Sequence, residues 1–277
     1  MHDYTNTTTV VTGASKGLGE AYARELASRG AHLVLVARSS DALNTLAGQL
    51  RKAHSVRVDV IAADLSDRRA AQTVADTVEE LGLEADLLVN NAGTGSVGPF
   101  LGRPLEPNLR SVDVNVTALV ALCHLLGARM VERGRGGIVN VASTAAFQPM
   151  PYQAGYAATK AFVLSFTEAL AEEVRHTGVR VMAAHPGAID TGFFDGTTAS
   201  VDPRAADTPA RIAAGTLDDF ARGRSVSYPG RAFNRAGTWA SRLLPRTTVV
   251  RITGGLNRKL GFDDVRDLAP GLDSAAS

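Results

Sequence analysis

The chain has 277 residues, of which 45% are hydrophobic and 21% are charged, so it can bury a large core and is not an intrinsically disordered protein. Its formal net charge of +1 gives no reason to expect nucleic acid as a partner. There is no uncharged apolar run of about 18 residues and no basic N-terminus followed by an apolar stretch, so we expect neither a membrane span nor a signal peptide. Cys123 is the one cysteine, which fits a reducing, cytoplasmic location.

Short runs rich in Val, Leu, Ile and Ala alternate with helical lengths along the first two thirds of the chain. The runs are 10–11, 32–37, 59–63, 85–89, 137–142 and 179–184. Such alternation is typical of β-α-β units in a parallel sheet that helices cover on both faces. Since no linker or repeat divides the chain, we expect one α/β domain over residues 1–277, with a doubly wound, Rossmann-type sheet.

A glycine-rich turn follows the first run directly, with the sequence Thr12-Gly13-Ala14-Ser15-Lys16-Gly17-Leu18-Gly19. Glycines let the backbone approach a pyrophosphate closely, and the next helix offers it unpaired N–H groups and a positive dipole end. The following residues have a helical pattern, with Leu18, Tyr22 and Leu26 on one side. We therefore expect a dinucleotide site here, formed by Gly13, Ser15, Lys16, Gly17, Leu18 and Gly19.

The end of the second run indicates which dinucleotide binds. An NAD site would place a carboxylate here, on the adenine ribose, whereas this chain has Arg38 and Ser39. Arg38 and Lys16 put two cations beside the ribose, and Ser39 can donate a hydrogen bond to a 2′-phosphate. We therefore expect NADP(H). Asp41 nearby is an argument for NAD, and a solvated surface arginine is the other interpretation of Arg38.

Three side chains can move a proton to or from a carbonyl or alcohol oxygen. Tyr156 and Lys160 are four residues apart on an expected helix and share a face, and Ser143 ends the fifth run. A free tyrosine has a pKa of about 10, and we expect the nearby ammonium to lower it. Tyr156 can then act as general acid or base, while Ser143 donates a hydrogen bond to the substrate oxygen.

Together these residues resemble the classical short-chain dehydrogenase/reductase family. The matching pieces are 12–19, Asp64-Leu65, 90–93, Asn115, Ser143, 156–160, and Pro186-Gly187 with Thr191. They come in the family's order and cover roughly the first 190 residues. The resemblance implies four catalytic residues, namely Asn115, Ser143, Tyr156 and Lys160. In that family Lys160 also binds the nicotinamide ribose, and Asn115 holds a water that relays protons to Lys160.

The resemblance implies further cofactor contacts and an assembly. Asn91, Ala92 and Gly93 would lie along the cofactor, Asp64 and Leu65 at the adenine, and Pro186, Gly187, Ile189 and Thr191 at the nicotinamide end. No metal site is expected. In the family, the two weakly charged helices expected at 114–128 and 161–171 pair about a two-fold axis, which implies a homodimer or homotetramer. Asp190 is the clearest departure from the family pattern.

The substrate pocket is expected to be apolar. Its expected lining is 93–95, 145–150 and 188–194, where Phe147, Met150, Phe193 and Phe194 supply apolar surface. We therefore expect reduction of an apolar ketone or aldehyde by NADPH, because cells usually keep NADP reduced. The alternatives are an NAD-dependent alcohol or hydroxysteroid dehydrogenase that works oxidatively, which Arg38 and Lys16 oppose, and a non-catalytic NADP-binding regulator, which the intact Ser143, Tyr156 and Lys160 oppose.

Two segments lie outside the family match. Residues 190–232 have weak periodicity and leave the sheet where ligands bind, so they are either a substrate lid or an ordinary surface excursion. Residues 233–277 form a basic extension, and between Arg222 and Phe262 there are nine basic residues and no acidic one. Apolar residues between the arginines could touch anionic lipid, or an acidic carrier or coenzyme A. We favour docking of the apolar residues on the domain, with the arginines paired or solvated.

Overall fold

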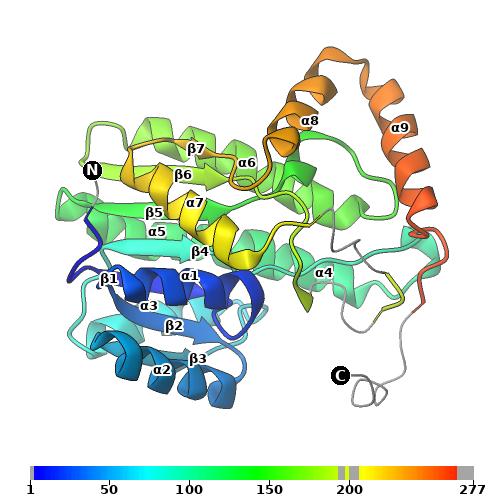
Figure 1. Cartoon of the computed structure of the whole chain (residues 1–277). Coiled ribbons are helices and arrows are strands. Elements are labelled where there is room, and N and C mark those ends of the chain that lie inside the picture. The colour runs from blue at the N-terminus through cyan, green and yellow to red at the C-terminus, as the bar shows by residue number, and fades with distance from the viewer. Residues whose placement is uncertain (1–2, 193–196, 200–205, 267–277) are drawn as a thin grey trace.

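The computed structural model describes residues 3–192, 197–199 and 206–266, and in this part of the chain one parallel sheet is the centre of the fold (Figure 1). Its strands are β1 (Thr8–Thr12), β2 (His32–Ala37), β3 (Val58–Ala62), β4 (Leu87–Asn90), β5 (Gly136–Val141), β6 (Val179–Ala184) and β7 (Val226–Ser227). Their order is β3-β2-β1-β4-β5-β6-β7. The chain changes direction across the sheet between β1 and β4, so the expected doubly wound architecture is confirmed.

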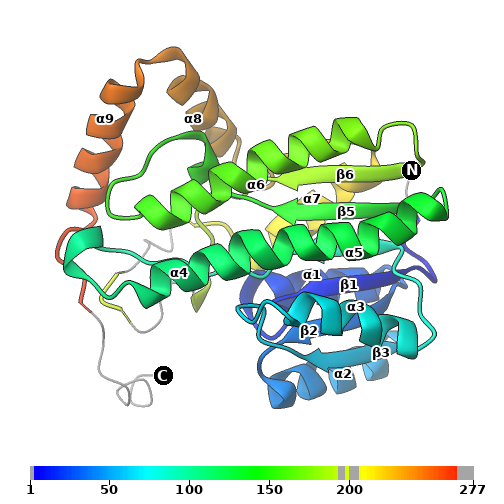
Figure 2. The same ribbon diagram turned by 180° about the vertical axis from the view of Figure 1, so that it is seen from behind.

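Helices cover both faces of the sheet, because successive strand residues point to opposite sides. Leu33 and Leu35 of β2 pack with α1 (Gly17–Ser28), α2 (Ser40–His54) and α7 (Pro209–Ala221). Val34 and Val36, which alternate with them, pack with α3 (Ala70–Glu80), α5 (Leu119–Glu132) and α6 (Ala154–Glu173). Figure 2 shows this second layer, with α5 and α6 running along the sheet.

The segment 190–232, expected as one lid or excursion, includes a core helix. In α7, Ile212, Leu217 and Phe220 are fully buried against the sheet, and the Tyr22 hydroxyl donates a hydrogen bond to Thr216 Oγ1 at 3.0 Å. Residues 209–221 are therefore part of the domain itself. The interpretation of 190–232 as a lid therefore does not apply to α7.

A long helical segment leads from the carboxyl edge of the sheet back along its face. It consists of α4 (Glu106–Val112), the π-helical turn η2 (Asp113–Ala118) and α5, after the short 3-10 turn η1 (Phe100–Gly102). By length and composition Glu106–Glu132 could cross a membrane, but 44% of its apolar window is buried in the domain. A buried core helix satisfies the same criterion, and here α5 packs on α3, β4 and β5.

The C-terminal part forms a helical hairpin that projects from the domain, as both views show. Its helices are α8 (Ala232–Leu243) and α9 (Arg246–Lys259). Phe233 and Leu243 are 81% and 82% exposed, and Trp239, Ile252 and Leu256 are also exposed. The expectation that the apolar residues of this segment dock on the domain is wrong for these side chains. The reason is that polar residues make the attachment, as described below.

Candidate active site

A cleft of about 1460 Å³ lies at the carboxyl ends of the strands. Its lining includes every residue predicted to bind the cofactor, together with Ser143, Tyr156 and Lys160. Asn115, the one predicted site residue outside that lining, lies directly behind it. The cleft is also lined by Asn257, Leu260 and Phe262, which come from α9 and the residues after it. The sequence had no signal for these three residues, because they are about a hundred positions from Tyr156.

The glycine-rich turn leaves room for a pyrophosphate. Gly13 and Gly17 have φ values of +67° and +59°, a backbone conformation that favours glycine. A Cβ on Gly19 would lie 2.0 Å from the carbonyl oxygen of Gly13, so only glycine fits there. Helix α1 begins at Gly17 with no side chain capping its N-terminus, so its first N–H groups can bind an anion. The turn therefore fits a dinucleotide.

Thr12 holds the two sides of this turn together. Its hydroxyl oxygen accepts hydrogen bonds from the backbone N–H groups of Asn91 (3.0 Å) and Ala92 (2.9 Å). The Asn91 side-chain amide donates to the Thr12 carbonyl at 3.0 Å. These bonds fix the ends of β1 and β4 at the point where the strand order reverses. This role of Thr12 was not predicted, although its place at the strand end, before Gly13, was a usable signal.

At the adenine end, the cleft is lined by Lys16, Arg38 and Ser39, and Asp41 is not part of the lining. Arg38 follows β2 and is exposed. The Ser39 hydroxyl oxygen accepts a hydrogen bond from Ala42 N and caps α2, and its proton is free to be donated elsewhere. Asp41, the carboxylate nearby, lies in the first turn of α2 and outside the cleft lining.

Asp64 is held by Ser66 and Arg110, two partners that were not predicted. Its carboxylate accepts hydrogen bonds from the backbone N–H and the hydroxyl of Ser66. It also forms an ion pair with Arg110 at 2.6 Å. Burial raises the pKa of the Asp64 carboxyl, but the hydrogen bonds from Ser66 and Arg110 outweigh it, so that the net pKa is lowered. Arg110 comes from α4 and also lines the cleft, where it pairs with Asp64.

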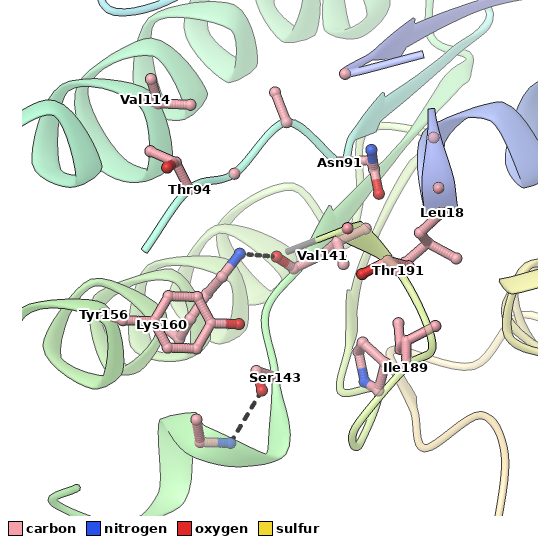
Figure 3. Close-up of a pocket in the computed structure, with 18 of the residues that line it drawn as sticks. Leu18, Asn91, Thr94, Val114, Val141, Ser143, Tyr156, Lys160, Ile189 and Thr191 are labelled. Atoms are coloured by element: carbon pink, nitrogen blue, oxygen red, sulfur yellow. Dashed lines mark hydrogen bonds between the residues drawn. The ribbon is translucent and has the colours of Figure 1, made fainter. Parts of the chain in front are cut away.

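Lys160 is buried on α6 and reaches across to β5 (Figure 3). Its ammonium donates a hydrogen bond to the carbonyl of Val141 at 2.7 Å and lies 5.9 Å from the centre of the Tyr156 ring. Burial lowers the pKa of Lys160 to about 8. Tyr156, Lys160 and Ser143 face the same space in Figure 3, as their spacing predicted.

The pKa of Tyr156 departs from the expectation. Burial raises it above the ordinary value, while the side-chain hydrogen bond with Ser143 lowers it in part. The expected lowering by Lys160 is wrong for this structure, because the loss of hydration dominates at a fully buried phenol. Ser143 Oγ accepts a hydrogen bond from Ala145 N at 3.1 Å. The phenol is therefore protonated at neutral pH and is available as an acid.

Asn115 lies in the π-helical turn η2, an irregularity that is frequent at functional sites. Its amide donates hydrogen bonds to the Thr94 carbonyl (2.8 Å) and Thr159 Oγ1 (2.9 Å), and its oxygen accepts one from Thr94 N (2.9 Å). A Cβ on Gly93 would lie 3.4 Å from both Asn115 Oδ1 and Lys160 Nζ. Asn115 and Lys160 thus flank the same glycine, and the water-holding role of Asn115 stays a prediction.

The substrate half of the cleft differs from the expected lining, because five of the described residues expected there do not line it, namely Gly95, Ala146, Phe147, Pro149 and Asp190. Phe147 packs its ring against His185 and Tyr228, with ring centres 4.9 and 6.0 Å apart, and is not part of the lining. Met150 does line the cleft, and Phe193 and Phe194 lie outside the described residues. Asp190 is exposed and does not line it.

The charges of the cleft are unevenly distributed. Among the described residues, its charged lining is Lys16, Arg38, Asp64, Arg110 and Lys160. All five lie on the cofactor side or at the catalytic centre. Beyond Tyr156, the described lining residues carry no charge and include Gln148, Met150, Leu260 and Phe262.

The chain is similar to known dehydrogenases and reductases. It is 31% identical over 257 residues to a very-long-chain 3-oxoacyl-CoA reductase of Anas platyrhynchos, which covers 91% of this chain and 80% of that protein. A short-chain dehydrogenase from Sphingobium yanoikuyae in complex with NADPH superposes with a TM-score of 0.76 and 32% identity, over 86% of this chain and 93% of that one. The bulky-bulky ketone specific alcohol dehydrogenase of Comamonas testosteroni superposes with a TM-score of 0.74 and 32% identity, over 86% of this chain and 93% of that one.

The family follows from these findings and from the site. The family model for short chain dehydrogenases matches residues 7–201, a range that contains the glycine-rich turn and Ser143, Tyr156 and Lys160. The chain belongs to the classical short-chain dehydrogenase/reductase family, whose members are oxidoreductases with a nicotinamide dinucleotide.

Proposed function

We propose that the protein uses NADPH to reduce a ketone or aldehyde with large apolar substituents. The observation that carries this proposal is the pairing of a protonated, buried Tyr156 with a substrate half of the cleft whose described lining residues are uncharged. The cations Lys16 and Arg38 at the adenine end support NADP(H) over NAD, because each can bind a 2′-phosphate. When bound, the cofactor supplies the hydride.

The residues of the chain then handle the proton. Tyr156 donates its phenolic proton to the substrate oxygen as negative charge develops there. Ser143 Oγ accepts a hydrogen bond from Ala145 N, and its O–H can be donated to the same substrate oxygen. Lys160, whose pKa burial lowers to about 8, lies beside Tyr156, and its ammonium favours the phenolate that forms. Asn115 is proposed to connect Lys160 to solvent through a water.

Two substrate classes have support. A bulky apolar ketone agrees with the uncharged lining and with the ketone-specific enzyme of Comamonas testosteroni. A 3-oxoacyl thioester agrees with the reductase of Anas platyrhynchos, whose likeness extends over 91% of this chain and thus beyond the cofactor half. Both have a ketone next to a large apolar group, and they differ in the polar thioester carrier.

Location and assembly are also proposals. We propose a cytoplasmic protein that assembles as a homodimer or homotetramer through α4, α5 and α6. Leu109, Val112 and Phe162 are partly exposed apolar side chains on these helices, which supports an interface there. Light scattering at micromolar concentration tests the assembly, and a monomer would contradict it.

The test is a binding measurement followed by turnover. NADPH and NADH are titrated by fluorescence, and then loss of NADPH absorbance is followed with aryl ketones, ketosteroids and 3-oxoacyl thioesters of increasing chain length. We expect NADPH to bind at least about tenfold more tightly than NADH, since a charge-assisted hydrogen bond is worth about 1.5–3 kcal/mol. Selective turnover of thioesters would favour the second class. NADPH binding without turnover of any carbonyl would contradict the proposal.

A further inference from the structure

Helix α8 has its polar side toward the domain and its apolar side toward solvent. Toward the domain, Asn234 donates a hydrogen bond to Asp207 at 3.4 Å. The Ser241 hydroxyl lies 3.3 Å from the Phe147 carbonyl and shares its proton between that oxygen and the Thr238 carbonyl of its own helix, at 2.9 Å. On the outward side, Phe233 and Leu243 are about four-fifths exposed and Trp239 is 55% exposed. This is the reverse of the ordinary pattern for a surface helix, in which the apolar stripe faces the core.

Helix α9 is attached in a similar way. Thr253 donates a hydrogen bond to the Pro149 carbonyl at 2.9 Å, and Asn257 donates one to the Pro151 carbonyl at 2.7 Å. Val249 is the buried apolar side chain of this helix, whereas Ile252 and Leu256 are about half exposed. The hairpin of the two helices projects from the domain (Figures 1 and 2). Exposed apolar side chains therefore lie on both of its helices.

The charge of the hairpin indicates the kind of surface that covers these side chains. Between Arg222 and Phe262 the chain has nine basic residues and no acidic one. Arg222, Arg224 and Arg231 pair with acidic residues of the domain, Asp219 and Asp207. Within the described residues no such ion pair forms at Arg246, Arg251, Arg258 or Lys259, which lie on α9. The outward surface is thus both apolar and positively charged.

A second copy of the chain is a poor occupant of this surface. In a two-fold interface the same patch meets itself, so the unpaired arginines of one hairpin would face those of the other. Like charges at close range are unfavourable, especially once apolar contact has removed the water. A partner with negative charge and an apolar layer fits better. An anionic bilayer has both, and Trp, Phe and Leu between arginines are typical of helices that lie at its interface.

The hairpin lies at the mouth of the cleft, so docking through it would bring the cleft close to the bilayer. Asn257 and Leu260, at the end of α9, line the substrate half of the cleft, while Ile252 and Leu256 on the same helix are exposed to solvent. The helix thus connects the outward apolar surface to the mouth of the cleft. We propose that the α8–α9 hairpin docks the protein on bilayers that contain anionic lipid, with the cleft mouth close to the acyl layer. The docking itself does not depend on the proposed reaction.

Trp239 is the only tryptophan of the chain, so its fluorescence reports on the hairpin alone. The full-length protein is titrated with vesicles of phosphatidylcholine and with vesicles that also contain phosphatidylglycerol. We expect a blue shift and co-flotation with the anionic vesicles, both reduced at high salt, and little change with the neutral ones. No shift with anionic vesicles, or an equal shift with neutral ones, would overturn the proposal.

Variants separate docking from other effects. The double variant Phe233→Glu and Leu243→Glu keeps Trp239 and should lose the shift and at least about tenfold in vesicle affinity, since it removes apolar contact and adds repulsion. Val131→Glu is the control, because Val131 is partly exposed at the far end of α5. Retained NADPH binding and circular dichroism show that both variants fold.

Two other outcomes would also count against docking on lipid. A blue shift that rises with protein concentration in the absence of vesicles would assign the surface to a second copy. A shift produced by an acidic carrier protein, but not by anionic vesicles, would assign it to a soluble partner. If docking occurs but no carbonyl is reduced, the proposed function fails and the docking proposal stands.

Discussion

The ammonium of Lys160 donates a hydrogen bond to the backbone carbonyl of Val141 at 2.7 Å, so the lysine of α6 is anchored to the end of β5. Both groups are buried, and Ser143 follows two residues after Val141. The bond therefore fixes the catalytic helix relative to the strand that carries the serine. It also keeps a cation in a poorly hydrated place, which has a measurable effect on stability.

Lys160→Met should change how stability depends on pH. The pKa of Lys160 is lowered from 10.5 to about 8 in the folded protein. Between these two pH values the unfolded chain binds more protons than the folded one, so the free energy of unfolding rises with pH across this window. The slope from one such group is at most about 1.4 kcal/mol per pH unit. We measure the free energy of unfolding of both proteins in urea at several pH values. The value for the wild type minus that for the variant should rise with pH across this window.

The difference between the two proteins is the quantity to measure, because other buried groups titrate in the same range. Burial raises the pKa of Cys123 to about 12 and also raises that of Tyr22. These groups lower the stability of both proteins at high pH, and they cancel in the comparison. A difference that is flat between pH 8 and 10 would mean that Lys160 is not desolvated as the structure indicates.

Tyr156→Phe should abolish turnover without affecting cofactor binding. The change removes the proton donor and keeps the ring, so we expect the rate of carbonyl reduction to fall by about 10²–10⁴. Tyr152→Phe is a matched control, because Tyr152 lies one helical turn earlier in sequence and does not line the cleft. Steady-state kinetics and NADPH titration check both variants. Unchanged turnover in Tyr156→Phe would contradict the proposed proton transfer.

Arg38→Asp should shift the preference from NADPH toward NADH. The change removes a cation beside the adenine end and adds a carboxylate that repels a 2′-phosphate and can bind ribose hydroxyls. We expect the affinity for NADPH to fall about tenfold to hundredfold, or about 1.4–3 kcal/mol. Lys52→Asp at the exposed end of α2 makes the same change in net charge outside the cleft. If both variants lowered the affinity for NADPH equally, the effect would come from long-range charge alone and not from a contact of Arg38 with the cofactor.

Gly19→Ala and Gly48→Ala should have opposite effects on stability. A Cβ on Gly19 would lie 2.0 Å from the Gly13 carbonyl oxygen, so the turn must shift, at a cost of about 1–3 kcal/mol or more. Gly48 is in the interior of α2 with nothing within 4 Å, and alanine there should stabilise by roughly 0.5–1 kcal/mol. Thermal unfolding checks both. The Gly19 variant should also lose NADPH binding, whereas the Gly48 variant should keep it.

The parts of the fold with a strong local pattern could be predicted from the sequence. The bounds of β2 and β6 agree with the apolar runs, and those of β3, β4 and β5 differ by one or two residues. The glycine-rich turn and the spacing of Tyr156 and Lys160 also depend on neighbouring residues alone. The site residues predicted from these segments meet in one cleft, because the carboxyl ends of parallel strands lie at one edge.

Features that depend on distant contacts were missed. Strand β7 has two residues, too few for a periodic pattern, and α7 lies in a segment whose composition resembled a loop. Whether the pKa of Tyr156 is raised or lowered depends on burial, which the spacing of residues in the sequence does not reveal. Leu260 and Phe262 reach the cleft only through the direction of α9. The sequence of α8 did contain a signal for its orientation. Asn234, Thr238 and Ser241 recur at helical spacing and form a polar side, opposite to its apolar residues.

The polar attachment of α8 and α9 also affects how the molecule opens. Hydrogen bonds from Asn234, Ser241 and Thr253 to the domain can be replaced by water, and little apolar surface becomes exposed when they break. Lifting the hairpin therefore requires far less free energy than unfolding the sheet, whose two layers bury large apolar clusters. Backbone amides of α8 and α9 should exchange with deuterium long before those of β1 and β4. A bound ligand or surface that slows this exchange would stabilise the hairpin selectively.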